Sequence, residues 1–428
     1  MHKDAGFKQA KNILYAPYFG MISKINPSVN FKGYDARPLY AVAMRNTDGF
    51  ALNEAASQMR QIGAKHGFKV IFEDGFVSKQ EERKREIRKE IGGEISEDSA
   101  KKPRFPVLAS LEDKFLNYFS KREKSDVTSW MQDCIYFTKD GILTAENNAE
   151  DFLPLSNTFG VKINTVPSSS FIAGGNLYIL KDDKKEKILV GASENREKAL
   201  EMFPGREVIS IPQADFHIDL VIRPLRDNTV LVADDDMSLD ILKNAADVLK
   251  KFSLESGDDK SLKEALSKLC KLIKKMESGR KTSVYKDTNS VIQTLEENGF
   301  RVIRTPGRVY RTKFVLSNIE SSIENELNFM NAIVHEDKGG ELCYISNKSN
   351  LLEELGISKE LAGKIGLDFE EEFKKAISEF VKPENIYFID GAAHKPFLAH
   401  RNIPNILKYL GGGVHCLCAE IPKEVLNK

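Results

Sequence analysis

The sequence predicts one large α/β domain in which a single structural unit recurs. Three observations support this fold class. Short runs of β-branched and aromatic residues, typical of strands, recur along the whole chain. Turn residues or amphipathic helical patterns separate these runs. Hydrophobic residues make up 41% of the 428 residues, and 28 Gly and 15 Pro are an ordinary share for a globular protein with a large core.

The first unit reads as a strand over 40–44, a helix over 52–67 and a second strand over 68–72. Similar units follow further along the chain. Each begins with a strand and a turn, continues with a strand or a helix, and ends with a strand. They comprise a hairpin over 133–145; strands 171–180, 187–191 and 208–211 with a helix over 199–203; strands 218–222, 229–233 and 299–303 with a helix over 291–298; and strands 327–333, 341–345 and 386–389 with a helix over 369–381. This gives about five units, but their sequence identity is too weak to establish a repeat.

Two segments interrupt this order. Residues 78–106 are almost entirely charged, which predicts a solvated helix on a surface insertion. Within 237–280, apolar residues follow helical spacing on both sides of a Ser-Gly-Asp-Asp break, which predicts an inserted helical hairpin. The hairpin is interpreted either as a lid or oligomer surface, or as an insertion packed on the main body.

Charge argues against two classes of partner. The 63 basic and 63 acidic residues cancel, whereas binding to nucleic acid or to an anionic membrane needs a basic surplus. No window approaches about 18 consecutive apolar residues, and charges are scattered through the first residues of the chain. We therefore expect a cytoplasmic protein, or one exported without a cleavable signal peptide.

The cysteines and histidines predict neither disulfides nor a metal site. The five cysteines are an odd number spread over a long chain, which does not indicate a disulfide framework. The seven histidines form none of the spacings with cysteine that bind zinc.

The most distinctive local motif is Gly411-Gly-Gly-Val-His-Cys416. Glycines allow the backbone to approach a ligand closely, and the following cysteine can then act as a nucleophile. The alternative interpretation is a buried, inert thiol that fills space in the core.

A second motif places His217 and Asp219 two residues apart at the start of an expected strand. Alternation along a strand would place both side chains on the same face, where they could protonate a leaving group and bind a cation. The alternative is a structural histidine whose hydrogen bonds are satisfied.

Two further motifs lie upstream. Trp130, the only tryptophan, stands three residues before Asp133, and an aromatic wall beside a carboxylate suits a planar cation. A tryptophan packed in the core is the alternative. Gly174 and Gly175 lie inside the expected strand 171–180, which indicates a bulge or a close backbone approach.

In this order, the four motifs resemble the pentein superfamily of guanidine-modifying enzymes, which includes agmatine and arginine deiminases, arginine:glycine amidinotransferase and dimethylarginine hydrolases. Residues 410–416 and 217–219 are most similar to the amidinotransferase branch, and 130–133 to agmatine deiminases. The stretch 190–196 also resembles a Gly-x-Ser-x-x-Arg motif of several members. The ordered motifs cover roughly residues 125–422.

The resemblance implies a five-bladed α/β propeller with inserted helical segments, in which residues 1–428 form one catalytic domain around a central channel. Cys416 would attack the guanidinium carbon, and His217 would serve as general acid and base. His415 ranks below His217, because adjacent side chains on a strand diverge. The residues assigned to substrate binding are Asp133, Asp219, Trp130, Gly174, Gly175, Asn176, Arg196, Gly412 and Gly413. No metal or cofactor is expected.

One departure from the pattern keeps two functions open. Deiminases of this group carry an acid where this chain has Ala173, several relatives have Asp at Asn176, and 166–170 contain no carboxylate. The first function is amidino transfer or deimination of a guanidine-containing small molecule or a protein arginine. The alternative is a catalytically silent fold that binds an arginine-like ligand or a protein partner. Both leave the oligomeric state open.

Other acidic clusters are not expected to carry chemistry. Residues 234–236 are expected to cap a helix. The clusters at 335–337 and 390–394 read as loops at the channel mouth.

Overall fold

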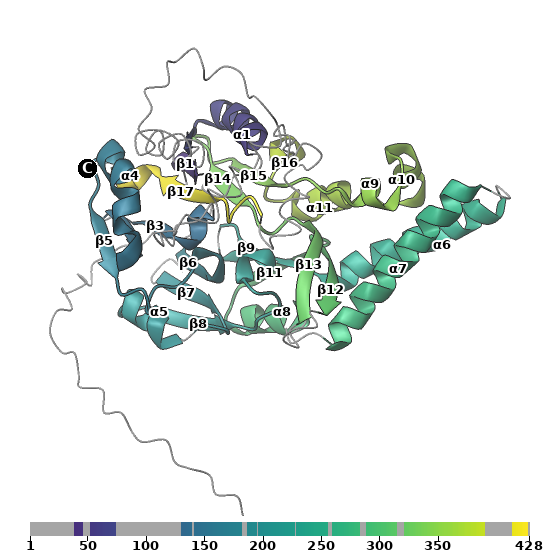
Figure 1. Cartoon of the computed structure of the whole chain (residues 1–428), viewed down its shortest axis with the longest axis horizontal. Helices are drawn as coiled ribbons and strands as arrows, with labels where there is room; N and C mark the ends of the chain where they lie inside the picture. The colour runs from purple at the N-terminus through teal and green to yellow at the C-terminus, as the bar shows by residue number, and fades with distance from the viewer. Residues whose placement is uncertain are drawn as a thin grey trace, which may run out of the picture.

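The computed structural model describes residues 38–45, 52–73, 130–138, 141–181, 186–194, 196–226, 228–255, 259–282, 288–314, 321–389 and 413–426 (Figure 1). The charged segment 78–106, Gly411, Gly412 and the cluster at 390–394 lie outside these ranges. None of the helices within them combines the length and the apolarity that crossing a bilayer requires.

Several small sheets and helices make up this α/β fold. Within the described ranges, five three-stranded sheets share one topology: an outer strand pairs antiparallel with the central strand, which pairs in parallel with the third. The sheets are β3 (Ile135–Thr138), β4 (Gly141–Ala145) and β5 (Ile163–Val166); β6 (Leu177–Lys181), β7 (Glu186–Gly191) and β8 (Glu207–Ile211); β9 (Ile222–Pro224), β10 (Thr229–Ala233) and β11 (Arg301–Thr305); β14 (Ile333–Glu336), β15 (Leu342–Asn347) and β16 (Ile386–Ile389); and β17 (Cys418–Pro422), β1 (Leu39–Arg45) and β2 (Lys69–Glu73).

The last of these sheets joins the two ends of the described chain. β17 pairs antiparallel with β1, with Met44 opposite Cys418, and β1 pairs in parallel with β2. Cys416 stands two residues before β17, so the same pairing fixes the position of this cysteine.

Helices connect the parallel strands, because a parallel pair needs a long crossover connection. They are α1 (Asn53–His66); η3 (Glu146–Phe152) and α4 (Leu153–Phe159); α5 (Arg196–Met202); α6 (Asp235–Glu255), α7 (Lys260–Thr282) and α8 (Thr288–Glu297); and α9 (Leu351–Leu355), α10 (Lys359–Ile365), α11 (Phe369–Ile377) and η6 (Pro383–Asn385). The short helix α13 (Lys423–Leu426) follows β17.

α6 and α7 are the two helices of the region 237–280, and they project away from the sheets as an antiparallel hairpin (Figure 1). Their apolar sides share one buried cluster with residues of the neighbouring strands and of α9 to α11. The hairpin therefore packs on the main body along part of its length.

One sheet is not anticipated by the sequence pattern. β12 (Arg308–Phe314) and β13 (Ser321–Asn328) form a two-stranded antiparallel ribbon beside α7. The strand expected over 327–333 is wrong in its extent, because β13 ends at Asn328 and the next strand begins at Ile333. Residues 329–332 form a connection, and this connection carries a group of the site described below.

Three short 3-10 turns precede the first strands of consecutive sheets. They are η2 (Met131–Asp133) before β3, η4 (Gly174–Asn176) before β6 and η5 (Ile218–Leu220) before β9, and η4 lies against both others. The expectations that Asp133, Gly174 and His217 lie in strands are therefore wrong. A Cβ atom on Gly174 would lie 2.1 Å from the carbonyl oxygen of Gln132, so the η2–η4 contact requires glycine.

A buried ion pair ties two of the sheets together. Arg223 Nη2 of β9 lies 2.8 Å from Glu420 Oε1 of β17, and the side chains are 0% and 1% exposed. The guanidinium carbon of Arg223 also lies 5.7 Å from the ring centre of Tyr178 in β6. A charge left in this environment without its partner would be costly.

We predict that Arg223→Met lowers the free energy of unfolding by about 3 to 5 kcal/mol, because it removes the cationic partner of a buried carboxylate, that of Glu420. Urea unfolding followed by circular dichroism measures this change. The matched control is Lys364→Met, which breaks an exposed pair with Glu360 and should cost no more than about 1 kcal/mol. Equal losses in the two variants would contradict a structural role for the buried pair.

Candidate active site

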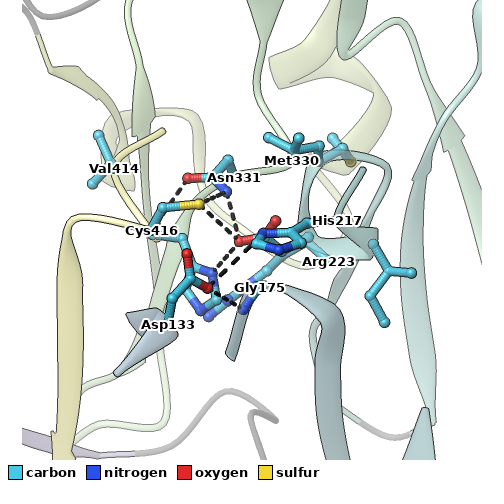
Figure 2. Close-up of polar contacts among 12 residues, drawn as sticks. Asp133, Gly175, His217, Arg223, Met330, Asn331, Val414 and Cys416 are labelled. Carbon is cyan, nitrogen blue, oxygen red and sulfur yellow. Dashed lines mark hydrogen bonds and ion pairs between the residues drawn. The ribbon is translucent and has the colours of Figure 1, made fainter. Parts of the chain in front are cut away.

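Cys416 is the centre of the candidate site. It lies in the turn before β17 and is 2% exposed. Its Sγ atom lies 3.3 Å from Oδ2 of Asp219 and 3.0 Å from Nδ2 of Asn331 (Figure 2). Two polar groups from distant parts of the chain therefore contact the thiol directly.

The two carboxylate oxygens of Asp219 have different surroundings. Oδ2 accepts a hydrogen bond from Nδ2 of Asn331 at 2.7 Å and lies 2.8 Å from Nδ1 of His415. Oδ1 is buried and has no hydrogen-bond partner among the residues that the structure describes. Because a buried carboxylate oxygen without a donor is unfavourable, Oδ1 is the atom that a ligand with N–H groups would satisfy.

His217 and Asp133 form the opposite side of the site. His217 Nδ1 lies 3.9 Å from Oδ1 of Asp133, and the same oxygen accepts a hydrogen bond from the backbone N–H of Gly175 at 2.9 Å (Figure 2). A Cβ atom on Gly175 would lie 2.4 Å from His217 Nδ1, so this approach requires glycine.

His217 and Asp219 reach the thiol from the start of a turn rather than from alternate positions on a strand. His217 directly precedes η5, and Asp219 is its second residue. One ligand-type atom from each of His217, Asp219 and Cys416 lies within 4.8 Å of the others. The proximity expected from the motif is present, but its geometric cause is different.

Burial and like charge control the ionisation of the acidic groups. Burial, followed by the nearby carboxylate of Asp133, raises the pKa of Asp219 well above its ordinary value. Burial also raises the pKa of Asp133, against the opposing effect of His217. Burial, and then the negative charges of Asp219 and Asp133, raise the pKa of the Cys416 thiol well above its ordinary value. A bound cation would favour the charged form of all three groups.

The cluster of His217, Asp219 and Cys416 also has the composition of a metal site. Two of its three members also contact a neutral amide, because Asn331 Nδ2 bridges Cys416 Sγ and Asp219 Oδ2 through hydrogen bonds.

Asn176 supports the site from behind. Its Oδ1 accepts hydrogen bonds from the backbone N–H of Ile218 and from Gln213 Nε2, both at 3.2 Å, and its Nδ2 donates to Ser193 Oγ at 3.0 Å. Gln213 Nε2 also donates to the carbonyl oxygen of Phe216 at 2.9 Å. These contacts fix the backbone on both sides of His217, so Asn176 positions the segment that carries this histidine.

Two further residues assigned to substrate binding are Trp130 and Arg196. Trp130 is half-buried and packs against an apolar cluster that includes Val414 and Leu417, which flank His415 and Cys416. Arg196 is exposed at the start of α5, where its Nε donates to the carbonyl oxygen of Val208 at 3.4 Å. Gly412 is outside the described ranges. Gly413 does lie in the site, because a Cβ atom there would lie 2.3 Å from Oδ1 of Asn331.

Sequence reasoning missed two groups of the cluster. Asn331 belongs to no motif, and its neighbours give no signal of a functional residue. His415 ranked below His217, but the structure buries it completely, with Nδ1 on Asp219 and the ring stacked on Tyr178 at 5.9 Å between centres. The sequence signal that could have identified His415 as a site residue was its position directly before Cys416.

The remaining acidic clusters have structural roles. Asp234 Oδ1 accepts hydrogen bonds from the backbone N–H groups of Asp236 and Met237, which confirms the expected helix cap. The expectation of a loop at 335–337 is wrong for His335, which is buried in β14. Its Nδ1 accepts from the backbone N–H of Leu39, and its Nε2 lies 3.0 Å from the carbonyl oxygen of His66.

Comparison with known proteins finds no matching family model and no matching curated protein. Among solved structures, an agmatine deiminase of C. jejuni is similar, with 12% identity, a TM-score of 0.43, and coverage of 92% of this chain and 95% of that one. The cyanobacterial arginine dihydrolase ArgZ, in its apo form, has 11% identity and a TM-score of 0.37 over 90% of this chain and 39% of its own. This chain thus spans well under half of ArgZ. Because these identities and TM-scores are low, we draw no conclusion from them.

We predict that alkylation of Cys416 by iodoacetamide is slow near neutral pH and still rises with pH above about 9, since the thiolate is the reactive form and burial, followed by the neighbouring carboxylates, disfavours it. Asp219→Asn removes the nearest negative charge, so its rate profile should move to lower pH, with alkylation about tenfold faster at pH 8. Peptide mass spectrometry at a series of pH values measures both profiles.

The exposed residue Asp240 provides the control, because Asp240→Asn should leave the alkylation profile of Cys416 unchanged. An unchanged profile in Asp219→Asn would show that this carboxylate does not control the thiol.

Proposed function

We propose that the protein is a cysteine-dependent enzyme that modifies a guanidine compound, either by deimination or by amidino transfer. The observation that carries the proposal is the arrangement of Cys416 beside Asp219, whose buried Oδ1 has no donor among the described residues, with Asp133 and His217 across the site. It brings together a thiol, two carboxyl groups and an imidazole.

The charge of the site favours a cationic substrate. Burial raises the pKa values of both Asp133 and Asp219, and the nearby carboxylate of Asp133 raises that of Asp219 further. A guanidinium ion supplies one positive charge and several N–H donors in one plane, so it can neutralise both carboxylates and satisfy Oδ1 of Asp219. Its charge also favours the thiolate form of Cys416.

The chemistry then follows from the positions of the groups. The Cys416 thiolate attacks the central guanidinium carbon, a C–S bond forms, and the π electrons of the C=N bond move to nitrogen. His217 donates a proton to the departing amine as the C–N bond breaks, which leaves an amidino thioether. His217 then accepts a proton from water or from an acceptor amine as this second nucleophile attacks the amidino carbon. A C–O or C–N bond forms, the C–S bond breaks, and Cys416 leaves as thiolate, which gives a ureido product from water or amidino transfer to the amine.

As part of this proposal, the chain has the five-bladed propeller fold of the penteins that its motifs resemble. Five sheets of one topology, with the fifth built from both ends of the described chain, support an arrangement of five blades. The turns η2, η4 and η5 that precede consecutive sheets meet near Cys416, as expected for a site in a central channel.

Ala173 favours a second candidate function, which is binding of an arginine-like ligand without turnover. Ala173 directly precedes η4 and offers no carboxylate where the resembling deiminases carry an acid. A guanidinium held by fewer anions would be less well oriented for attack by the thiolate.

The test is mass spectrometry of products after incubation of wild type and Cys416→Ser with arginine, agmatine, methylarginines and guanidinoacetate, each with and without glycine. A ureido product that requires Cys416 identifies a deiminase, and an amidino product that requires glycine identifies a transferase. Cys416→Ser should lose at least about a thousandfold in rate. Tight binding measured by calorimetry without any product would favour the second function.

We predict that Gly175→Ala lowers turnover by at least about tenfold. The added Cβ would lie 2.4 Å from Nδ1 of His217 and 3.2 Å from Oδ1 of Asp133, so the imidazole ring or the carboxylate would have to move. Steady-state kinetics on the substrate found above measures the loss. Gly363→Ala is the matched control: its Cβ meets nothing within 4 Å, and turnover should not change. Equal activity of the two variants would argue against a site that requires close approach of the backbone.

A further inference from the structure

The side-chain amide of Asn331 uses all its hydrogen-bonding groups within the site. Oδ1 accepts from the backbone N–H of Cys416 at 3.2 Å, while Nδ2 lies 3.0 Å from Cys416 Sγ and 2.7 Å from Asp219 Oδ2. The backbone N–H can only donate, so it fixes the oxygen of the amide on its side. The two hydrogens of Nδ2 therefore face the sulfur and the carboxylate.

The connection 329–332 holds this amide firmly in place. Asn328 Oδ1 accepts from the backbone N–H groups of Met330 and Asn331, at 2.9 and 3.2 Å. Asn347 Nδ2 donates to the carbonyl oxygen of Asn331 at 3.4 Å, and Asn347 Oδ1 accepts from the backbone N–H of Val414 at 2.9 Å. One residue, Asn347, thus ties the connection that carries Asn331 to the turn that carries Cys416.

Among the groups that face the thiol, Asn331 contributes a fixed donor without adding charge. Asp219 and Asp133 are acidic and disfavour the thiolate, while His217 and His415 approach from η5 and from the cysteine's own turn. An N–H donor 3.0 Å from sulfur stabilises the charged form of the sulfur, and a donor already in position needs no reorganisation when that charge develops.

We infer that Asn331 is a catalytic residue, which stabilises the Cys416 thiolate through its amide N–H while holding Asp219 Oδ2 so that Oδ1 remains available to a ligand. The inference rests on the proposed role of Cys416 as the nucleophile. Asn331 lies outside every sequence motif, yet its side chain contacts the reacting sulfur atom directly.

The test replaces Asn331 with Leu, which has a similar volume and no donor. The alkylation rate of Cys416 with iodoacetamide should fall about ten- to a hundredfold at pH 8, and its pH profile should move to higher pH, because a hydrogen bond to a charged group is lost. Asn385→Leu replaces another buried asparagine, in η6, and should leave the Cys416 profile unchanged.

A structural role alone would lower the unfolding midpoint without moving the pH profile. If Asn331→Leu does not fold, Asn331→Ala removes the same donor with less crowding and is measured in the same way. A wild-type pH profile in a folded variant of either kind would overturn the inference.

The alkylation readout separates this inference from the proposed function. If wild type turns over no guanidine but both variants shift the profile, the control of the thiol by Asn331 stands and the proposed reaction fails. If wild type does turn over a guanidine and the profile does not move in Asn331→Leu, the inference alone fails.

Discussion

The structure depends on one costly constraint, the complete burial of the Asp219 carboxyl group beside a thiol. A carboxylate removed from water must find its donors within the protein. The donors here are Asn331, His415 and Cys416, which lie 112, 196 and 197 residues away in the sequence. Three separate turns must therefore meet at one point, and only sheets that fix the ends of those turns can bring them there.

Two layers of contacts make this meeting point rigid. Close to the thiol, Gly175 and Gly413 leave room for the His217 ring and the Asn331 amide. Behind it, the ring of Tyr178 contacts two groups: it stacks on His415, and the guanidinium carbon of Arg223 lies 5.7 Å from its centre. The buried pair of Arg223 with Glu420 thus connects the support of the site with the pairing of strands that closes the last sheet.

Local charge, rather than net charge, indicates the ligand. The chain as a whole is neutral, which argues against polyanionic partners but says nothing about a small enclosed site. In that site, burial and then the charges of Asp219 and Asp133 raise the pKa of the Cys416 thiol. Binding of a cation is then linked to activation of the thiol, because the charge that satisfies the carboxylates also favours the thiolate.

The sequence by itself determined most of the succession of strands and helices and indicated six residues that come together: Asp133, Gly175, His217, Asp219, Gly413 and Cys416. These follow from local signals, since periodicity, glycine runs and short polar motifs each lie within a few residues. Only the tertiary structure decided that η2, η4 and η5 are turns rather than strands, and that Trp130 packs in an apolar cluster. Only the tertiary structure placed Asn331 beside the thiol, because the two residues are 85 positions apart and no local sequence pattern predicts that their two connections meet.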